Sequence, residues 1–102
     1  MSNRFKIKEE EDFVILFDDS SSSFSLLQGN IEVGSIKTRT LGSKMWLDHV
    51  YIDPKLRGRK LGELLVLSAL SYLEQADFDV VPVCNYAKAI IRRKIKPAGE
   101  SK

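Results

Sequence analysis

The chain has 102 residues, of which 43% are hydrophobic and 29% charged, and its formal net charge is +2. This length is typical of one domain around a single buried core. The one cysteine, Cys84, excludes an internal disulfide framework and a cysteine-cluster zinc site, and no metal site is predicted. No apolar run approaches the ~18–20 residues of a membrane span, and the N-terminus lacks the apolar segment of a signal peptide. We therefore expect a cytoplasmic protein.

Charge is distributed unevenly along the chain. Residues 1–53 carry 6 Lys/Arg and 9 Asp/Glu, whereas residues 54–102 carry 10 and 5. A basic half on a nearly neutral protein favours an anionic ligand over bulk binding of nucleic acid.

The first half of the chain is predicted to consist of strands. Apolar residues alternate with polar ones or form short runs, and turn residues separate these segments. The predicted strands are 5–7, 13–17, 24–27, 31–38 and 45–52. The alternation slips by one residue at Gly34-Ser35, which indicates a bulge. In the last of these strands, unbroken alternation would put His49 and Tyr51 on one face and Trp46, Val50 and Ile52 on the other.

The pattern changes to helical spacing after Pro54. Leucines recur every three or four residues and predict a helix over 60–76, followed by a short buried strand over 80–83. Asn85 is positioned to cap a second helix, and residues 97–102 are expected to form a flexible tail behind a single domain of residues 1–96. A strand, a helix and a second strand in this order form a βαβ crossover, so we predict an α+β fold with a mixed, mainly antiparallel sheet.

The segment between strand 45–52 and the first helix is rich in arginine, lysine and glycine. Its sequence over residues 56–62 is Leu-Arg-Gly-Arg-Lys-Leu-Gly. Amides at a helix N-terminus lack intrahelical partners, and the helix dipole adds partial positive charge, so this place suits a phosphate. The alternative is an ordinary solvated basic turn.

Residues 50–62 resemble motif A of the GNAT N-acetyltransferase superfamily, in which a strand, a glycine-rich basic loop and a helix follow one another. With Leu-Asp-His at 47–49 and Pro-Val-Cys-Asn-Tyr at 82–86, the chain is similar to the minimal single-domain branch of that superfamily over residues 30–93. The resemblance implies a compact GNAT-like fold and acetyl-coenzyme A (CoA) as cofactor. The residues it implies for cofactor binding are Val50, Tyr51, Ile52, Arg57, Gly58, Arg59, Lys60, Leu61, Gly62 and Asn85.

Three side chains are candidates for catalysis. Cys84 precedes a predicted helix N-terminus, where a thiolate is stabilised and can accept an acyl group, but a lone cysteine is also commonly a small buried hydrophobe. His49 is the only histidine and can act as a base, or it can be structural. Tyr86 can protonate a leaving thiolate or anchor the core.

The predicted function is transfer of acetyl from acetyl-CoA to an amine on a small molecule or a protein. The alternative is a CoA-binding or interaction module without turnover, because Lys60, Val50 and Ile90 depart from the usual text of the branch. A nucleic-acid accessory role is a weaker third reading, because the basic cluster 92–94 lacks interleaved aromatic residues and is typical of a solvated helix end. The sequence does not indicate an oligomeric state.

Overall fold

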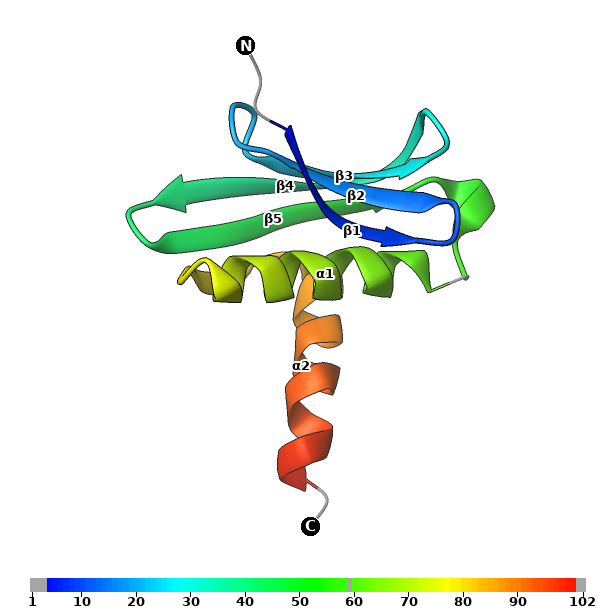
Figure 1. The fold of residues 1–102 in the computed structure, drawn as a ribbon. Helices are drawn as coiled ribbons and strands as arrows, with labels where there is room; N and C mark the ends of the chain where they lie inside the picture. Colours follow the sequence, from blue (N-terminus) through cyan, green and yellow to red (C-terminus); the bar gives the residue numbers. More distant parts are fainter. Residues whose placement is uncertain (1–3, 59, 101–102) are drawn as a thin grey trace.

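The computed structural model describes residues 4–58 and 60–100, with side chains described as far as Arg93. Six strands form one sheet in chain order, with every neighbouring pair antiparallel except β5 and β6, which are parallel (Figure 1). The strands are β1 (Arg4–Glu10), β2 (Phe13–Asp18), β3 (Ser23–Gln28), β4 (Ile31–Leu41), β5 (Lys44–Ile52) and β6 (Asp79–Pro82). A 3-10 turn η1 (Pro54–Leu56) and helix α1 (Leu61–Gln75) join β5 to β6, and α2 (Asn85–Glu100) ends the chain. The predicted α+β class and mixed sheet are confirmed.

Helix α1 lies along one face of the sheet. Helix α2 runs roughly perpendicular to α1 and extends away from the body of the molecule (Figure 1). Buried side chains of the sheet and the two helices form one hydrophobic core, to which β2, β3, β4, β5, α1 and α2 contribute. Phe24 is fully buried there, and its ring lies near those of Phe17 and Tyr72, with centroids 4.8 and 6.3 Å away. The alternating strands and the leucine spacing of α1 therefore meet in the layer that the sequence pattern requires.

Besides a bulge at Ile7 in β1, two bulges change which residues of β4 and β5 face this core. In β4 the extra residue is Val33, next to the predicted slip at Gly34. In β5 it is Asp48, because Lys37 pairs with His49 whereas Thr38 pairs with Leu47. The second bulge was not predicted, and it makes the placement of Trp46 on the face of Val50 and Ile52 wrong. Met45 and Leu47 are the buried residues before the bulge, and Ile52 is buried after it.

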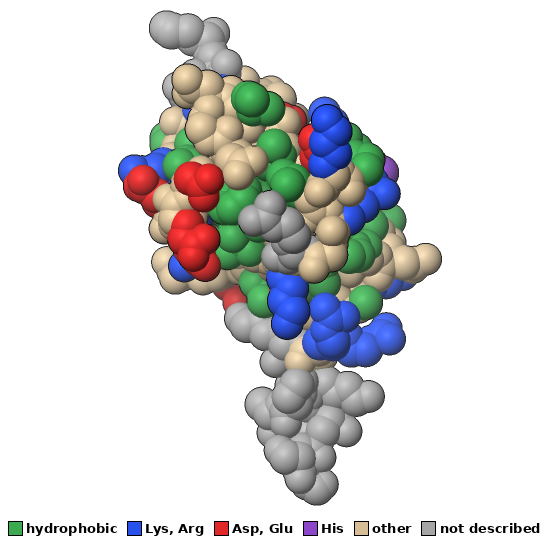
Figure 2. Space-filling view, turned by 90° about the vertical axis from the view of Figure 1, so that its right-hand side faces the viewer, with side chains coloured by type: hydrophobic (Ala, Val, Ile, Leu, Met, Phe, Trp, Pro, Cys, Tyr) green, Lys and Arg blue, Asp and Glu red, His purple; other side chains and the backbone are tan. Residues whose placement is uncertain are grey.

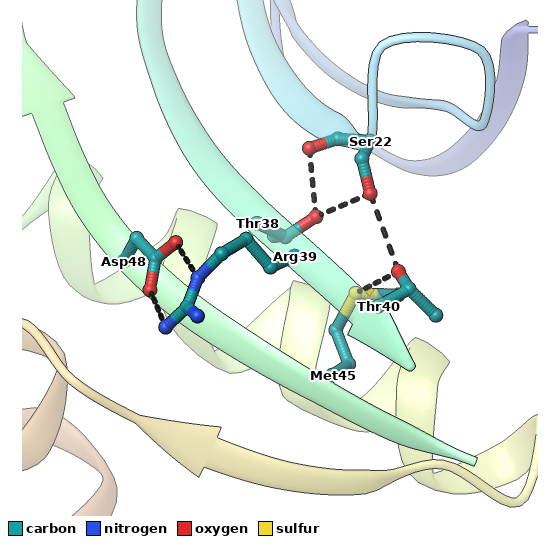
Figure 3. Close-up of polar contacts among 6 residues, drawn as sticks. All are labelled: Ser22, Thr38, Arg39, Thr40, Met45 and Asp48. Atoms are coloured by element: carbon teal, nitrogen blue, oxygen red, sulfur yellow. Dashed lines mark hydrogen bonds and ion pairs between the residues drawn. The ribbon is translucent and has the colours of Figure 1, made fainter. Parts of the chain in front are cut away.

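Hydrogen bonds and an ion pair connect polar side chains of β4, β5 and the turn before β3 (Figure 3). Arg39 donates to both carboxylate oxygens of Asp48, at 2.5 and 2.9 Å, and its guanidinium lies 5.2 Å from the centroid of the Trp46 ring. The hydrogen bonds from Arg39 lower the pKa of the Asp48 carboxyl. On β4, the amide and hydroxyl of Thr38 both donate to the Ser22 carbonyl, at 3.0 and 2.7 Å. These contacts hold the outer part of the β4–β5 hairpin and its link to the turn before β3.

The last elements differ slightly from the sequence prediction. The carbonyl of Cys84 accepts the Lys88 amide at 2.9 Å, so the cap position of α2 lies one residue before Asn85. Pro82 is tolerated because β6 is an edge strand, where a missing amide breaks no second ladder. Helix α2 continues to Glu100, and the flexibility of residues 97–102 stays a prediction. Within the described residues, no helix has the length and apolar character to cross a membrane.

Candidate functional site

Strands β5 and β6 separate at the end of the sheet where η1 begins. Their pairing runs from Lys44 with Asp79 to Leu47 with Pro82, and the Leu47 carbonyl then accepts the amides of Val83 and Cys84, at 2.9 and 3.2 Å. Strand β6 ends there, whereas β5 continues to Ile52. In the part of the chain that the structure describes, residues 49–52 therefore have a strand partner on the β4 side only. Their other edge offers unpaired backbone groups.

A hollow of about 360 Å³ lies at this unpaired end of β5. It is lined by Val50, Ile52, Leu56, Arg57, Gly58, Lys60, Leu61, Gly62 and Tyr86. Figure 2 looks onto the end of the molecule where η1 and the start of α1 lie, and shows hydrophobic side chains between acidic ones on the left and basic ones below. The volume is within the usual range of ~300–1,000 Å³ for small-molecule sites.

The loop that lines the hollow is shaped by short-range hydrogen bonds. The Asp53 side chain accepts a hydrogen bond from the Lys55 amide at 2.9 Å, and its carbonyl accepts one from the Leu56 amide at 2.8 Å. These two bonds stabilise the turn η1. Gly58 and Lys60 then adopt left-handed backbone conformations, with φ of 87° and 61°. A glycine takes this conformation freely, whereas at Lys60 it costs ~1–2 kcal/mol.

Helix α1 begins directly after this turn, and its first backbone groups border the hollow. The Leu64 amide makes the first intrahelical bond, to the Lys60 carbonyl at 3.1 Å. Within the described residues, the amides of Leu61 and Gly62 have no hydrogen-bond acceptor. Unpaired amides and the positive end of the helix dipole favour an anion at this place.

Two cationic side chains add full charges to the same hollow. The Nε of Arg57 donates to the carbonyl of Ile52 at 3.0 Å, which holds the guanidinium at the end of β5. Lys60 lies on the border of this hollow and of two neighbouring ones. Arg59, the third predicted cation of the loop, lies outside the described residues.

The remaining predicted residues do not line this hollow. His49 and Tyr51 are exposed on β5, on the face of the sheet turned away from the core. Cys84 is half-buried against the core, and Asn85 is exposed at the first position of α2. Leu56 is not among the predicted site residues, although its half-buried side chain packs against the core and lines the hollow. Its position inside the basic loop was the available signal.

The geometry of this end of the sheet agrees with a family comparison. The family model of GCN5-related N-acetyl-transferases matches residues 23–97. The chain belongs to this family. No curated protein matches the chain.

Solved structures of other family members share the fold. An aminoglycoside acetyltransferase from an uncultured soil metagenomic sample, solved with sisomicin, is 17% identical with a TM-score of 0.59. The match covers 94% of this chain but only 64% of the aminoglycoside enzyme. The ribosomal-protein-S18-alanine N-acetyltransferase from Escherichia coli is 12% identical with a TM-score of 0.62, and the match covers 93% of this chain and 77% of that one. At these identities the likeness concerns the fold.

Proposed function

We propose that this GCN5-related acetyltransferase binds acetyl-CoA in the hollow beside β5 and transfers the acetyl group to an amine. The observation that carries the proposal is the meeting of three features in one hollow: the unpaired edge of β5, the free amides at the start of α1, and the side chains of Arg57 and Lys60. An elongated ligand with a pyrophosphate and an amide-bearing arm complements all three. The family membership supports the same cofactor.

The residues divide into two groups by chemistry. Arg57, Lys60 and the amides of Leu61 and Gly62 supply the donors and positive charge that a pyrophosphate needs. The free edge of β5 can pair with the amides of the pantetheine arm and donate a hydrogen bond to the thioester carbonyl. Such a donor stabilises the negative charge that develops on that oxygen during acyl transfer. Bound acetyl-CoA supplies the activated acetyl group.

Proton transfer is assigned to the side chains nearest the hollow. Tyr86 lines it and is 47% exposed, but its phenol lies against Gly62, where the pyrophosphate is expected, so it can donate a proton to the leaving sulfur only after its side chain rotates toward β5. Neither His49 nor Cys84 lines it, which favours water as the acceptor of the amine proton. The role of Cys84 as an acyl carrier stays a prediction, and its packing against the core supports the alternative of a small buried hydrophobe.

The absence of His49 and Cys84 from the lining of the hollow also favours a second candidate function. A protein that keeps the cofactor cradle but has no base beside it would bind CoA without turnover. Discharge of acetyl-CoA in the presence of a panel of amines separates the two functions, because only the enzyme releases free CoA in proportion to the acetylated amine.

Cofactor binding is tested by thermal unfolding with CoA, acetyl-CoA and ATP. At ~100 times its dissociation constant, a ligand adds about 2.7 kcal/mol to the free energy of unfolding, which raises the Tm of a domain near this size by ~10–20 °C. We expect CoA and acetyl-CoA to raise Tm clearly more than ATP at equal concentration. ATP shares the adenine nucleotide but lacks the pantetheine arm that β5 would hold. Equal shifts, or none at saturating ligand, would contradict the cofactor assignment.

Lys60→Gly is expected to stabilise the fold while weakening CoA binding. Removing the side chain relieves a left-handed conformation, so the free energy of unfolding rises by about 0.5–1 kcal/mol. It also removes one charge-assisted contact to phosphate, so CoA affinity falls by about 10-fold. Asp77→Gly is the matched control, because Asp77 has a φ of 66° at the far end of α1 and does not line the hollow. It should stabilise without changing affinity. Tighter binding by Lys60→Gly would show that Lys60 crowds the cofactor instead of holding it.

A further inference from the structure

The first turn of α2 contacts the first turn of α1 through the aromatic ring of Tyr86. Gly62 is the second residue of α1 and is buried, and Tyr86 is the second residue of α2. A Cβ atom built on Gly62 would lie 2.7 Å from both Cε2 and Cζ of Tyr86, and it would overlap the phenol oxygen. The ring therefore lies directly against the backbone of Gly62.

This contact differs from the other crowded glycine of the structure. At Gly34 a Cβ would meet Ile52 Cδ1 at 2.7 Å and the backbone oxygen of Tyr51 at 3.0 Å. A backbone atom within a sheet moves aside less readily than the end of a side chain, so a substitution at Gly34 is expected to strain the β4–β5 pairing. At Gly62 the three nearest atoms all belong to the outer end of one side chain, which is 47% exposed and can rotate into solvent. A side chain at residue 62 would therefore displace the Tyr86 ring and leave the fold intact.

We propose that Gly62 is a positioning residue for Tyr86, because the missing Cβ at residue 62 creates the seat that holds the Tyr86 ring in the hollow. Residue 62 then determines where the Tyr86 hydroxyl lies, and a substitution at the start of α1 acts through a side chain of α2. The position of the ring stands on the geometry alone, whereas its consequence for acetyl transfer rests on the proposed function. Glycine at this place is thus explained by a neighbouring ring as well as by the approach of a phosphate.

The position of the ring is measured by ¹⁹F NMR on protein labelled with 3-fluorotyrosine. The chain has three tyrosines, so three resonances are expected, and Tyr→Phe variants of Tyr51, Tyr72 and Tyr86 assign them. Gly62→Ala should move the Tyr86 resonance and increase its H₂O/D₂O solvent shift, with the other two resonances unchanged. Gly42→Ala is the control for backbone strain without a displaced ring, because a Cβ there meets no atom within 4 Å but the φ of 61° makes the substitution costly, and it should leave the Tyr86 resonance in place. An unchanged Tyr86 resonance in folded Gly62→Ala overturns the proposal.

Thermal unfolding provides a second measurement that needs no ligand. Tm is compared for wild type, Gly62→Ala, Tyr86→Ala and the double variant. Without the ring, the three atoms nearest to a Cβ at residue 62 are gone and alanine is the better helix former, so Gly62→Ala should leave Tm unchanged or raise it by a few degrees, at most about 8 °C. With the ring present, the same substitution should give a smaller rise or a fall. An identical change in Tm in both backgrounds means that residue 62 acts independently of Tyr86 and overturns the proposal.

The same four proteins connect the ring to acetyl transfer. Gly62→Ala should change the rate by a different factor in wild type than in Tyr86→Ala, because only the wild type has a ring for the new methyl group to displace, whereas any direct effect on the cofactor is the same in both. Multiplicative losses would show that Gly62 contributes separately and contradict the positioning role. Absence of CoA binding by the wild type would remove the proposed function while leaving the NMR result to decide the position of the ring.

Discussion

Arg57→Glu is expected to weaken CoA binding by at least about 100-fold. The side chain of Arg57 lines the hollow, and its Nε donates to the Ile52 carbonyl, so the guanidinium is held where the pyrophosphate is expected to lie. A hydrogen bond to a charged group contributes about 1.5–3 kcal/mol, and a glutamate adds repulsion between like charges. Since 1.4 kcal/mol corresponds to a tenfold change in affinity, the two effects together reach two orders of magnitude. Isothermal titration with CoA measures the change.

Two further variants separate local contact from general electrostatics. Lys55→Glu makes the same change in net charge two residues away, on an exposed side chain that does not line the hollow. Exposed charges beyond direct contact are screened by salt, so its affinity should change by less than about 3-fold at 0.15 M ionic strength. Arg57→Gln removes the charge without reversing it and should fall between the two. Equal losses for Lys55→Glu and Arg57→Glu would show that Arg57 is not a ligand of the phosphates.

Phe24→Ala is expected to produce the largest loss of stability. Phe24 is fully buried between Phe17 and Tyr72, with centroid distances of 4.8 and 6.3 Å. Truncation of a buried phenylalanine removes its transfer free energy and leaves a cavity, which costs ~3–5 kcal/mol. A domain has only ~5–15 kcal/mol in total, so the urea midpoint should fall by a fifth or more, and Tm by more than about 12 °C.

Phe5→Ala provides the comparison within the same sheet. Phe5 pairs with Phe17 across the β1–β2 ladder, but its side chain is 46% exposed on the edge strand. We expect a smaller loss, of about 1–1.5 kcal/mol, because nearly half of its surface already contacts water. Similar losses for the two phenylalanines would mean that β1 and α1 enclose a tighter core than the exposures indicate.

The sequence pattern was sufficient to predict the elements and the position of the basic loop between β5 and α1. Alternation with period 2 distinguishes strands from the 3.6-residue spacing of α1, and both are local properties of neighbouring residues. The basic loop could be located for the same reason, since a strand, a turn and a helix start are contiguous in the chain. Residues 57–62, apart from Arg59, line one hollow because a single turn connects them.

Local pattern was insufficient where a second strand sets the register. The prediction for Trp46 assumed unbroken alternation, and the bulge at Asp48 reversed the phase of β5 relative to β4. Asp48 also accepts two hydrogen bonds from Arg39, a residue of the neighbouring strand. A bulge depends on the pairing of two strands, so the sequence of one strand contains only part of the information.

The sequence by itself determined the α+β class, the strand–loop–helix unit and the chemical character of the loop. Only the tertiary structure decided which candidates meet there. Tyr86, in the first turn of α2, contacts Gly62 in the first turn of α1. His49, in contrast, faces away from the core, and Cys84 packs against it. The physical reason is that residue type and spacing specify local conformation, whereas contact between residues 24 positions apart depends on how α1 and α2 pack on the same sheet.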